Sequence, residues 1–159
     1  MGPLFEQLSR YLMNVGLVMR QVPNHPMVLI TMEGTEDRRW EFVGCTEENL
    51  RLVAMWCRFP FVCPPERMPT MCEFIVRGNF QMLQGAFGMD HADGELRFTV
   101  SATFADISPS DALLGGMARY VNEVADQFYP SMKAIVDGTT EIDEALGSAF
   151  EPPDATEWA

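Results

Sequence analysis

Side chains that could carry out chemistry are few in this sequence. It holds two histidines, His25 and His91, and four cysteines, at positions 45, 57, 63 and 72. A cysteine nucleophile needs an exposed position and a nearby base. Cys63, which precedes a proline, is the thiol that we expect to be most exposed, and with His91 and carboxylates it would form a small hydrolase-like site. Because no spacing ties His91 to Cys63, we expect the chain not to be an enzyme.

The same side chains do not form a metal-binding or cofactor-binding motif. The cysteines contain no Cys-x-x-Cys pair, which structural zinc sites normally show. Asp90, His91 and Asp93 cluster at a predicted hairpin, where Asp and Gly are what the turn itself requires. Cys57 and Cys72 fall on apolar stripes and are expected to be inert core thiols. We therefore expect no metal and no cofactor.

The net charge limits the class of partner. The 159 residues carry a net charge of −12, and 47% of them are hydrophobic, which is enough to build a core. A charge of this sign disfavours both nucleic-acid backbones and anionic membranes. Half of the excess lies in residues 138–159, so we expect one domain over residues 1–138. Residues 139–159 would then be an acidic tail with a short amphipathic segment.

The N-terminal residues do not resemble a secretion signal. Met1 to Glu6 lack a basic start, and an acid stands where an apolar run would continue. No stretch approaches the roughly 20 apolar residues that span a bilayer. We expect a cytoplasmic protein whose four cysteines are free thiols.

Hydrophobic periodicity predicts an α+β fold. The expected order is helix, three strands, helix, two strands and helix. We expect a five-stranded, mostly antiparallel sheet with the helices packed on one face. The predicted ranges are Pro3–Val15, Met27–Glu33, Trp40–Cys45, Leu50–Phe59, Pro64–Leu83, Ala86–Asp90, Glu95–Phe104 and a last helix capped by Ser108 that ends at Asp137. Pro60 is expected to stop the third strand, and the second helix would alternatively end at Gly78-Asn79.

This order resembles the type III secretion chaperone-like fold, and three motifs resemble the YbjN family. They are Asn79 to Asp90, Asp93 to Phe98, and Ala125 to Pro130. The resemblance implies a regulator of bacterial sensory transduction, that is, a non-enzymatic, protein-binding module that regulates or chaperones its partner. A type III secretion-type chaperone for an effector protein is the alternative.

Six residues are candidates for a partner or dimer surface, and the resemblance implies a homodimer that binds protein. Asn79 is expected to anchor the loop after its helix by hydrogen bonds, because it lies on the apolar stripe. Tyr129 packs, in the simpler interpretation, at the edge of the core. Trp158 would anchor the tail to its own domain or to a neighbouring molecule. The candidates are Trp56, Asn79, Arg97, Asp126, Tyr129 and Trp158.

Overall fold

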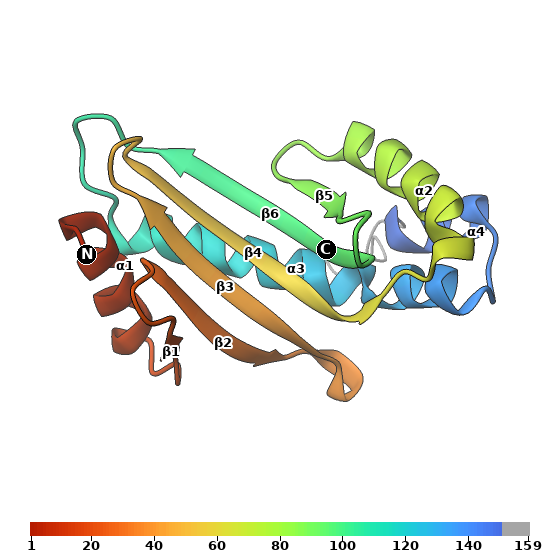
Figure 1. The fold of residues 1–159 in the computed structure, drawn as a ribbon, viewed down its shortest axis with the longest axis horizontal. Coiled ribbons are helices and arrows are strands. Elements are labelled where there is room, and N and C mark those ends of the chain that lie inside the picture. Colours follow the sequence, from red (N-terminus) through yellow and green to blue (C-terminus); the bar gives the residue numbers. More distant parts are fainter. Residues whose placement is uncertain (151–159) are drawn as a thin grey trace, which may run out of the picture.

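A single antiparallel sheet forms the centre of the molecule. The computed structural model describes residues 1–150. Within them, six strands pair in the order β1-β2-β3-β4-β6-β5, and every pairing is antiparallel (Figure 1). The strands are β1 (Arg20–Gln21), β2 (Met27–Glu33), β3 (Arg39–Glu47), β4 (Leu52–Val62), β5 (Ala86–Met89) and β6 (Glu95–Thr103). The α+β class and the predicted meander β2-β3-β4 are confirmed.

Two predictions about the strands were wrong. The sheet has six strands rather than five, because β1 is a pair of exposed polar residues that leaves no alternating pattern in the sequence. β4 also continues through Pro60 to Val62. The pairing of β4 with β6 shifts register between Arg58 and Val62, so the proline lies where the ladder is already interrupted.

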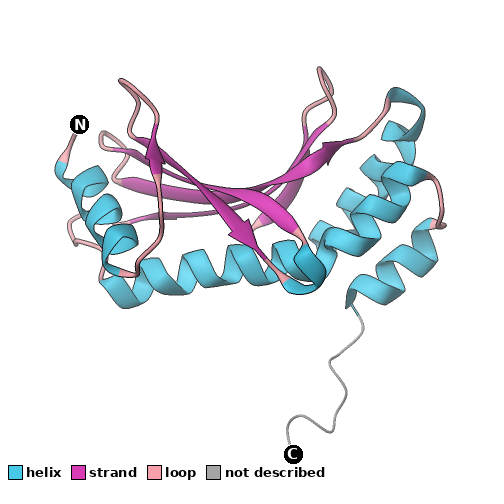
Figure 2. Cartoon of the chain, turned by 90° about the horizontal axis from the view of Figure 1, so that it is seen from below, coloured by secondary structure: helices cyan, strands magenta, loops and turns pink. Residues whose placement is uncertain are grey.

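Within residues 1–150, all four α-helices lie on one side of the sheet, and the other face carries no α-helix (Figure 2). The long α3 runs across the sheet, α1 lies at one end, and α2 and α4 lie together at the other (Figure 1). Their bounds are α1 (Pro3–Asn14), α2 (Met68–Gln81), α3 (Asp111–Asp137) and α4 (Ile142–Phe150). This arrangement is the one expected from the element order.

The helix ends differ from the predictions by a few residues. The Ser110 hydroxyl, not that of Ser108, caps α3 by accepting a hydrogen bond from the Leu113 N–H. α2 begins at Met68, because residues 65–67 form a separate 3-10 turn. It passes Gly78, as predicted, but ends at Gln81 rather than at Leu83. Gly138 ends α3 with a φ of 69°, a conformation that favours glycine.

The core lies between the sheet and α3. Along β6, Leu96, Phe98 and Val100 alternate toward the helices and are buried, as predicted. The Phe98 ring lies 5.8 Å from that of Tyr120 on α3, and on the neighbouring strand β5 the Phe87 ring lies 4.7 Å from that of Phe128, also on α3. The alternate residues of each strand therefore point to the helix-free face.

The amphipathic segment near the C-terminus is a helix that joins the folded body. α4 buries Ala145, Leu146 and Ala149 against its neighbours. The Phe150 ring stacks edge-on against Phe128 of α3, with the ring centres 5.0 Å apart. Residues 142–150 thus pack onto the core even though they follow the predicted domain boundary at residue 138.

Candidate protein-binding surface

The outward face of α2 presents a row of large apolar side chains to solvent. Val76 is 69% exposed, Phe80 is 92% exposed and Leu83, just after the helix, is fully exposed. Val76 and Phe80 are four residues apart, which places them on one side of the helix, and Leu83 follows two residues after the helix ends. We name Val76, Phe80 and Leu83 the outer stripe. Beside it lies a hollow of about 510 Å³ lined by Val76, Arg77, Phe80 and Gln81.

The charges beside the outer stripe are already paired. The Arg77 guanidinium contacts the carboxylate of Glu73 at 3.2 Å and that of Asp143, on α4, at 2.7 Å. The hydrogen bond with Asp143, followed by the one with Glu73, raises the pKa of Arg77. These contacts tie α2 to α4 and leave the stripe itself without a charged side chain.

Asn79 lies on the inner side of α2 and fastens the edge strand β5. Its amide nitrogen donates to the Phe87 carbonyl at 3.0 Å, and its amide oxygen accepts from the Phe87 N–H at 2.7 Å. The side chain thus bonds both backbone groups of Phe87, as a neighbouring strand would. The prediction that Asn79 anchors the segment after its helix is confirmed.

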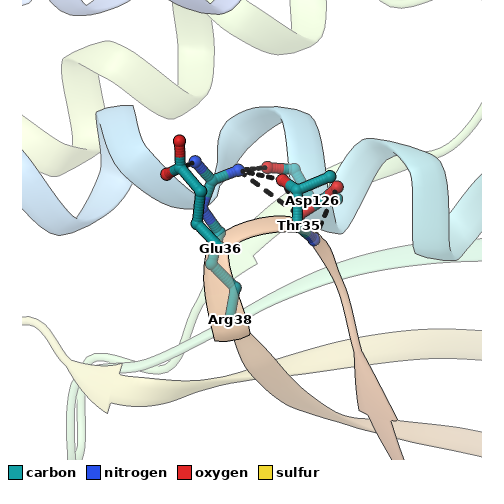
Figure 3. A network of polar contacts seen from close by, with 4 residues as sticks. All are labelled: Thr35, Glu36, Arg38 and Asp126. Carbon is teal, nitrogen blue, oxygen red and sulfur yellow. Dashed lines mark hydrogen bonds and ion pairs between the residues drawn. The ribbon is translucent and has the colours of Figure 1, made fainter.

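Asp126 is held in an internal network rather than left free for a partner. Its carboxylate accepts hydrogen bonds from the Thr35 backbone N–H at 3.1 Å and from the Thr35 hydroxyl at 3.1 Å. Arg38 reaches the same carboxylate at 3.3 Å and contacts Glu36 at 2.6 Å (Figure 3). These contacts attach the β2–β3 turn to α3.

The side chains of Tyr129 and Trp40 make contacts within the domain. The half-buried Tyr129 ring lies 5.1 Å from that of Phe61, edge to face, and 6.2 Å from that of Phe59. The simpler interpretation of Tyr129, packing at the edge of the core, is confirmed. Trp40 is buried, and its indole N–H donates to the Asn122 side-chain oxygen at 2.8 Å.

Trp56 and Arg97 lie together on the helix-free face of the sheet. Leu29, Val43, Trp56 and Thr99 are neighbours across four strands there. The Arg97 guanidinium lies 5.9 Å from the centre of the half-buried Trp56 ring, within the range of a cation–π contact.

Ion pairs border this apolar row. Glu41 contacts Arg20 at 3.7 Å and also pairs with Arg58. Arg58 reaches Glu95 at 3.4 Å. Charged side chains from four strands thus lie beside the Trp56 row.

The cysteine predictions were wrong for two of the four residues. Cys63 is only 1% exposed and belongs to the core cluster. Its backbone lies so close to Gly94 that a side chain at position 94 would collide with it. Burial, followed by the neighbouring Cys72 thiol, raises the pKa of Cys63. Cys72 is partly exposed, and its sulfur lies 3.5 Å from Nε2 of His91. The thiol beside the imidazole is therefore Cys72 rather than Cys63.

The Asp90–Asp93 hairpin has the chemistry of a turn. The Asp90 carboxylate accepts from the Ala92 N–H at 2.8 Å, and the Asp93 carboxylate accepts from the Glu95 N–H at 2.9 Å. Within residues 1–150, no group of three His, Cys, Asp or Glu side chains is placed to hold a metal ion.

Two sequence predictions concern membranes and the tail. None of the helices in the described part of the chain is long and apolar enough to cross a bilayer. Trp158 lies outside the described residues, and its role stays a prediction.

Comparison with known proteins identifies the family. Residues 4–134 match the YbjN family, whose description is "Putative bacterial sensory transduction regulator". The chain therefore belongs to the YbjN family. No curated protein matches it.

Two solved structures are similar to the chain. The crystal structure of YbjN from E. coli has a TM-score of 0.58 at 10% identity and covers 84% of this chain and 89% of its own. A chain in the crystal structure of the ExsC-ExsE complex has a TM-score of 0.49 at 11% identity and covers 76% and 89%, respectively. The first similarity supports the family fold.

Proposed function

We propose that this chain is a cytoplasmic, non-enzymatic, protein-binding member of the YbjN family and that two copies pair through the outer stripe of α2. The exposure of Phe80 carries the proposal. A phenyl ring that is 92% exposed loses nothing in stability by being covered and gains the free energy of leaving water. Val76, one helical turn before Phe80, and Leu83, just after the end of α2, are exposed apolar side chains as well.

A second copy of the chain suits this surface. A two-fold interface brings a patch against itself, so a patch of like charges would repel its copy. The chain carries a net charge of −12, but the outer stripe bears no charge, and Arg77 beside it is paired with two carboxylates. The spacing of the stripe is also the spacing by which one helix packs against another.

A regulatory role would then be exercised through protein contacts. The family description supports regulation, and the alternative is a chaperone of the type III secretion type that holds a segment of an effector. That alternative predicts a complex with a different chain on the same stripe. Capture from the source cell with the wild-type chain, but not with a variant of the stripe, would favour it.

The pairing is tested by sedimentation velocity over a wide range of concentration. The wild-type chain is expected to pass from monomer to dimer as concentration rises. Phe80→Glu with Leu83→Glu places two carboxylates in the stripe, and this double variant is expected to remain a monomer. Because both side chains are exposed, its thermal unfolding is expected to match that of the wild type.

Val18→Glu is the matched control, because Val18 is also 92% exposed but lies next to β1, away from α2. This variant is expected to dimerise as the wild type does. A wild-type chain that sediments as a monomer at every concentration contradicts the pairing. A double variant that still dimerises would show that the outer stripe is not the interface.

A further inference from the structure

The outer stripe of α2 is small for an interface between two copies. Its three side chains expose on the order of 500 Å² per copy, whereas a standard interface buries about 800 Å² on each partner. A stable pair therefore needs a second contact beside the stripe. On the basis of the proposed pairing, we infer that Trp158 of each copy enters the hollow beside the outer stripe of its partner.

The hollow offers what an indole side chain needs. It measures about 510 Å³, and Val76 and the Phe80 ring give it apolar walls. An aromatic ring that enters it can pack against Phe80, and the plane of the paired Arg77 guanidinium can lie against the same ring. Gln81, which is exposed, has an amide oxygen that can accept a hydrogen bond from the indole N–H.

Trp158 is the side chain outside the described residues that suits such a hollow. Among residues 151–159 it is the one large apolar side chain, and the segment also carries Glu151, Asp154 and Glu157. The indole gains free energy by leaving water, whereas the carboxylates are more stable in solvent. We therefore expect the indole alone to enter the hollow, as an aromatic anchor does in other interfaces.

The end of α4 brings this segment close to α2. A Cβ atom built at Gly78 of α2 would lie 3.9 Å from Cε2 of Phe150, the last described residue. Trp158 follows Phe150 by eight residues, which span at most about 28 Å. Helices that pack face to face have axes about 8–10 Å apart. The hollow of a partner paired through the outer stripe is therefore within reach of Trp158.

The area of the interface favours the partner's hollow over the hollow of the same chain. Trp158 in its own hollow would cover Phe80 and reduce the surface left for pairing. Trp158 in the partner's hollow adds buried surface between the two copies. Because a two-fold axis makes the exchange reciprocal, two indole rings are buried for each dimer.

The first test measures the dimer dissociation constant of Trp158→Ala in the full chain by sedimentation equilibrium. The dimer is expected to weaken by at least about tenfold, because a buried aromatic anchor is lost. Trp158→Phe keeps an aromatic ring and is expected to retain most of the affinity. Thr156→Ala changes a neighbouring residue in the same segment and is expected to have no effect.

An unchanged constant in Trp158→Ala overturns the exchange, and so does a stronger dimer, which would mean that the indole covers its own chain. Failure of this inference can be told apart from failure of the pairing. If Phe80→Glu with Leu83→Glu abolishes the dimer and Trp158→Ala does not, the pairing through the stripe stands and the exchange is wrong.

The second test identifies the chain in which the hollow is filled. Unlabelled full chain with a photo-crosslinking benzophenone side chain at position 158 is mixed with a tenfold excess of ¹⁵N-labelled wild type. After irradiation, mass spectrometry is expected to find position 158 joined to ¹⁵N-labelled peptides that contain Val76 or Phe80. Cross-links to unlabelled peptides of α2 alone, or to peptides from other elements, overturn the exchange.

Discussion

The outer stripe of α2 and the helix-free face of the sheet both present apolar side chains that no other element of the described chain covers, but their surroundings differ. On the sheet, Trp56 is half-buried among its neighbours and lies beneath Arg97, with the ion pairs of Glu41 beside it. On α2, Phe80 projects from the helix, and no charged group of residues 1–150 covers it.

We expect this difference to separate a surface that remains in water from one that binds protein. Guanidinium groups with apolar stems cover aromatic surface while keeping their charge in solvent. On the sheet face, Arg97 lies over the Trp56 ring in this way, so we expect this face to remain in solvent. The outer stripe has no such cover, and its burial would cost little desolvation of charge. We therefore expect the two faces to respond differently to substitution.

Trp56→Ala is expected to have the largest effect on stability and none on pairing. The half-buried ring packs between Val43 and Thr99, and its removal is expected to lower the free energy of unfolding by about 2 kcal/mol. Urea denaturation measures the loss. A dimer that weakens in this variant would show that the sheet face takes part in pairing.

Phe80→Ala is expected to have the opposite pattern. The ring makes few contacts within the chain, so the free energy of unfolding of the monomer is expected to change by less than about 0.5 kcal/mol. The dimer is expected to weaken by more than about tenfold, because a central aromatic side chain dominates a small interface. Sedimentation equilibrium measures the dimer dissociation constants of the variant and of the wild type. A large loss of monomer stability would mean that the ring packs internally.

Glu41→Gln is expected to have the smallest effect. It removes the carboxylate that pairs with Arg20 and Arg58, both of which remain well exposed, so the cost is expected to be about 0.5 kcal/mol or less. Adding salt to the wild type should remove most of this difference. The dimer should be insensitive to both changes. A dimer that weakens with salt would assign the charged sheet face a role in pairing.

Much of the fold is predictable from the sequence because its patterns are local. The alternation of Leu96 to Phe104 identifies β6 and its buried side, and the stripe of α3 continues to Gly138. β1 is not predictable, because its two residues form a strand only through their pairing with β2, which leaves no pattern in the sequence. Pro60 led to a wrong end for β4, because a proline is expected to stop a strand only where the hydrogen-bonded ladder is regular. The register shift between β4 and β6 that accommodates Pro60 cannot be seen in the sequence.

The candidate surface is less predictable, because exposure depends on what packs against a helix. The stripe of α2 that includes Met71 and Cys72 identifies the inner side, but it does not show that Val76 and Phe80 opposite lack a cover. The presence of apolar residues on the side of α2 opposite to its buried stripe is the sequence feature from which the candidate surface could have been predicted. Cys63 is buried and Cys72 is partly exposed, the reverse of the prediction, because burial depends on packing between segments far apart in the sequence, such as Cys63 and Gly94, which are 31 residues apart.

Hydroxyl-radical footprinting at low and high protein concentration tests the contrast between the two faces most directly, because it reports side-chain accessibility residue by residue. The account predicts that oxidation of Phe80 and Leu83 falls as the dimer forms, whereas oxidation of Trp56 stays constant. Oxidation of Phe80 that is equally fast at both concentrations, or protection of Trp56 at the higher one, would contradict it.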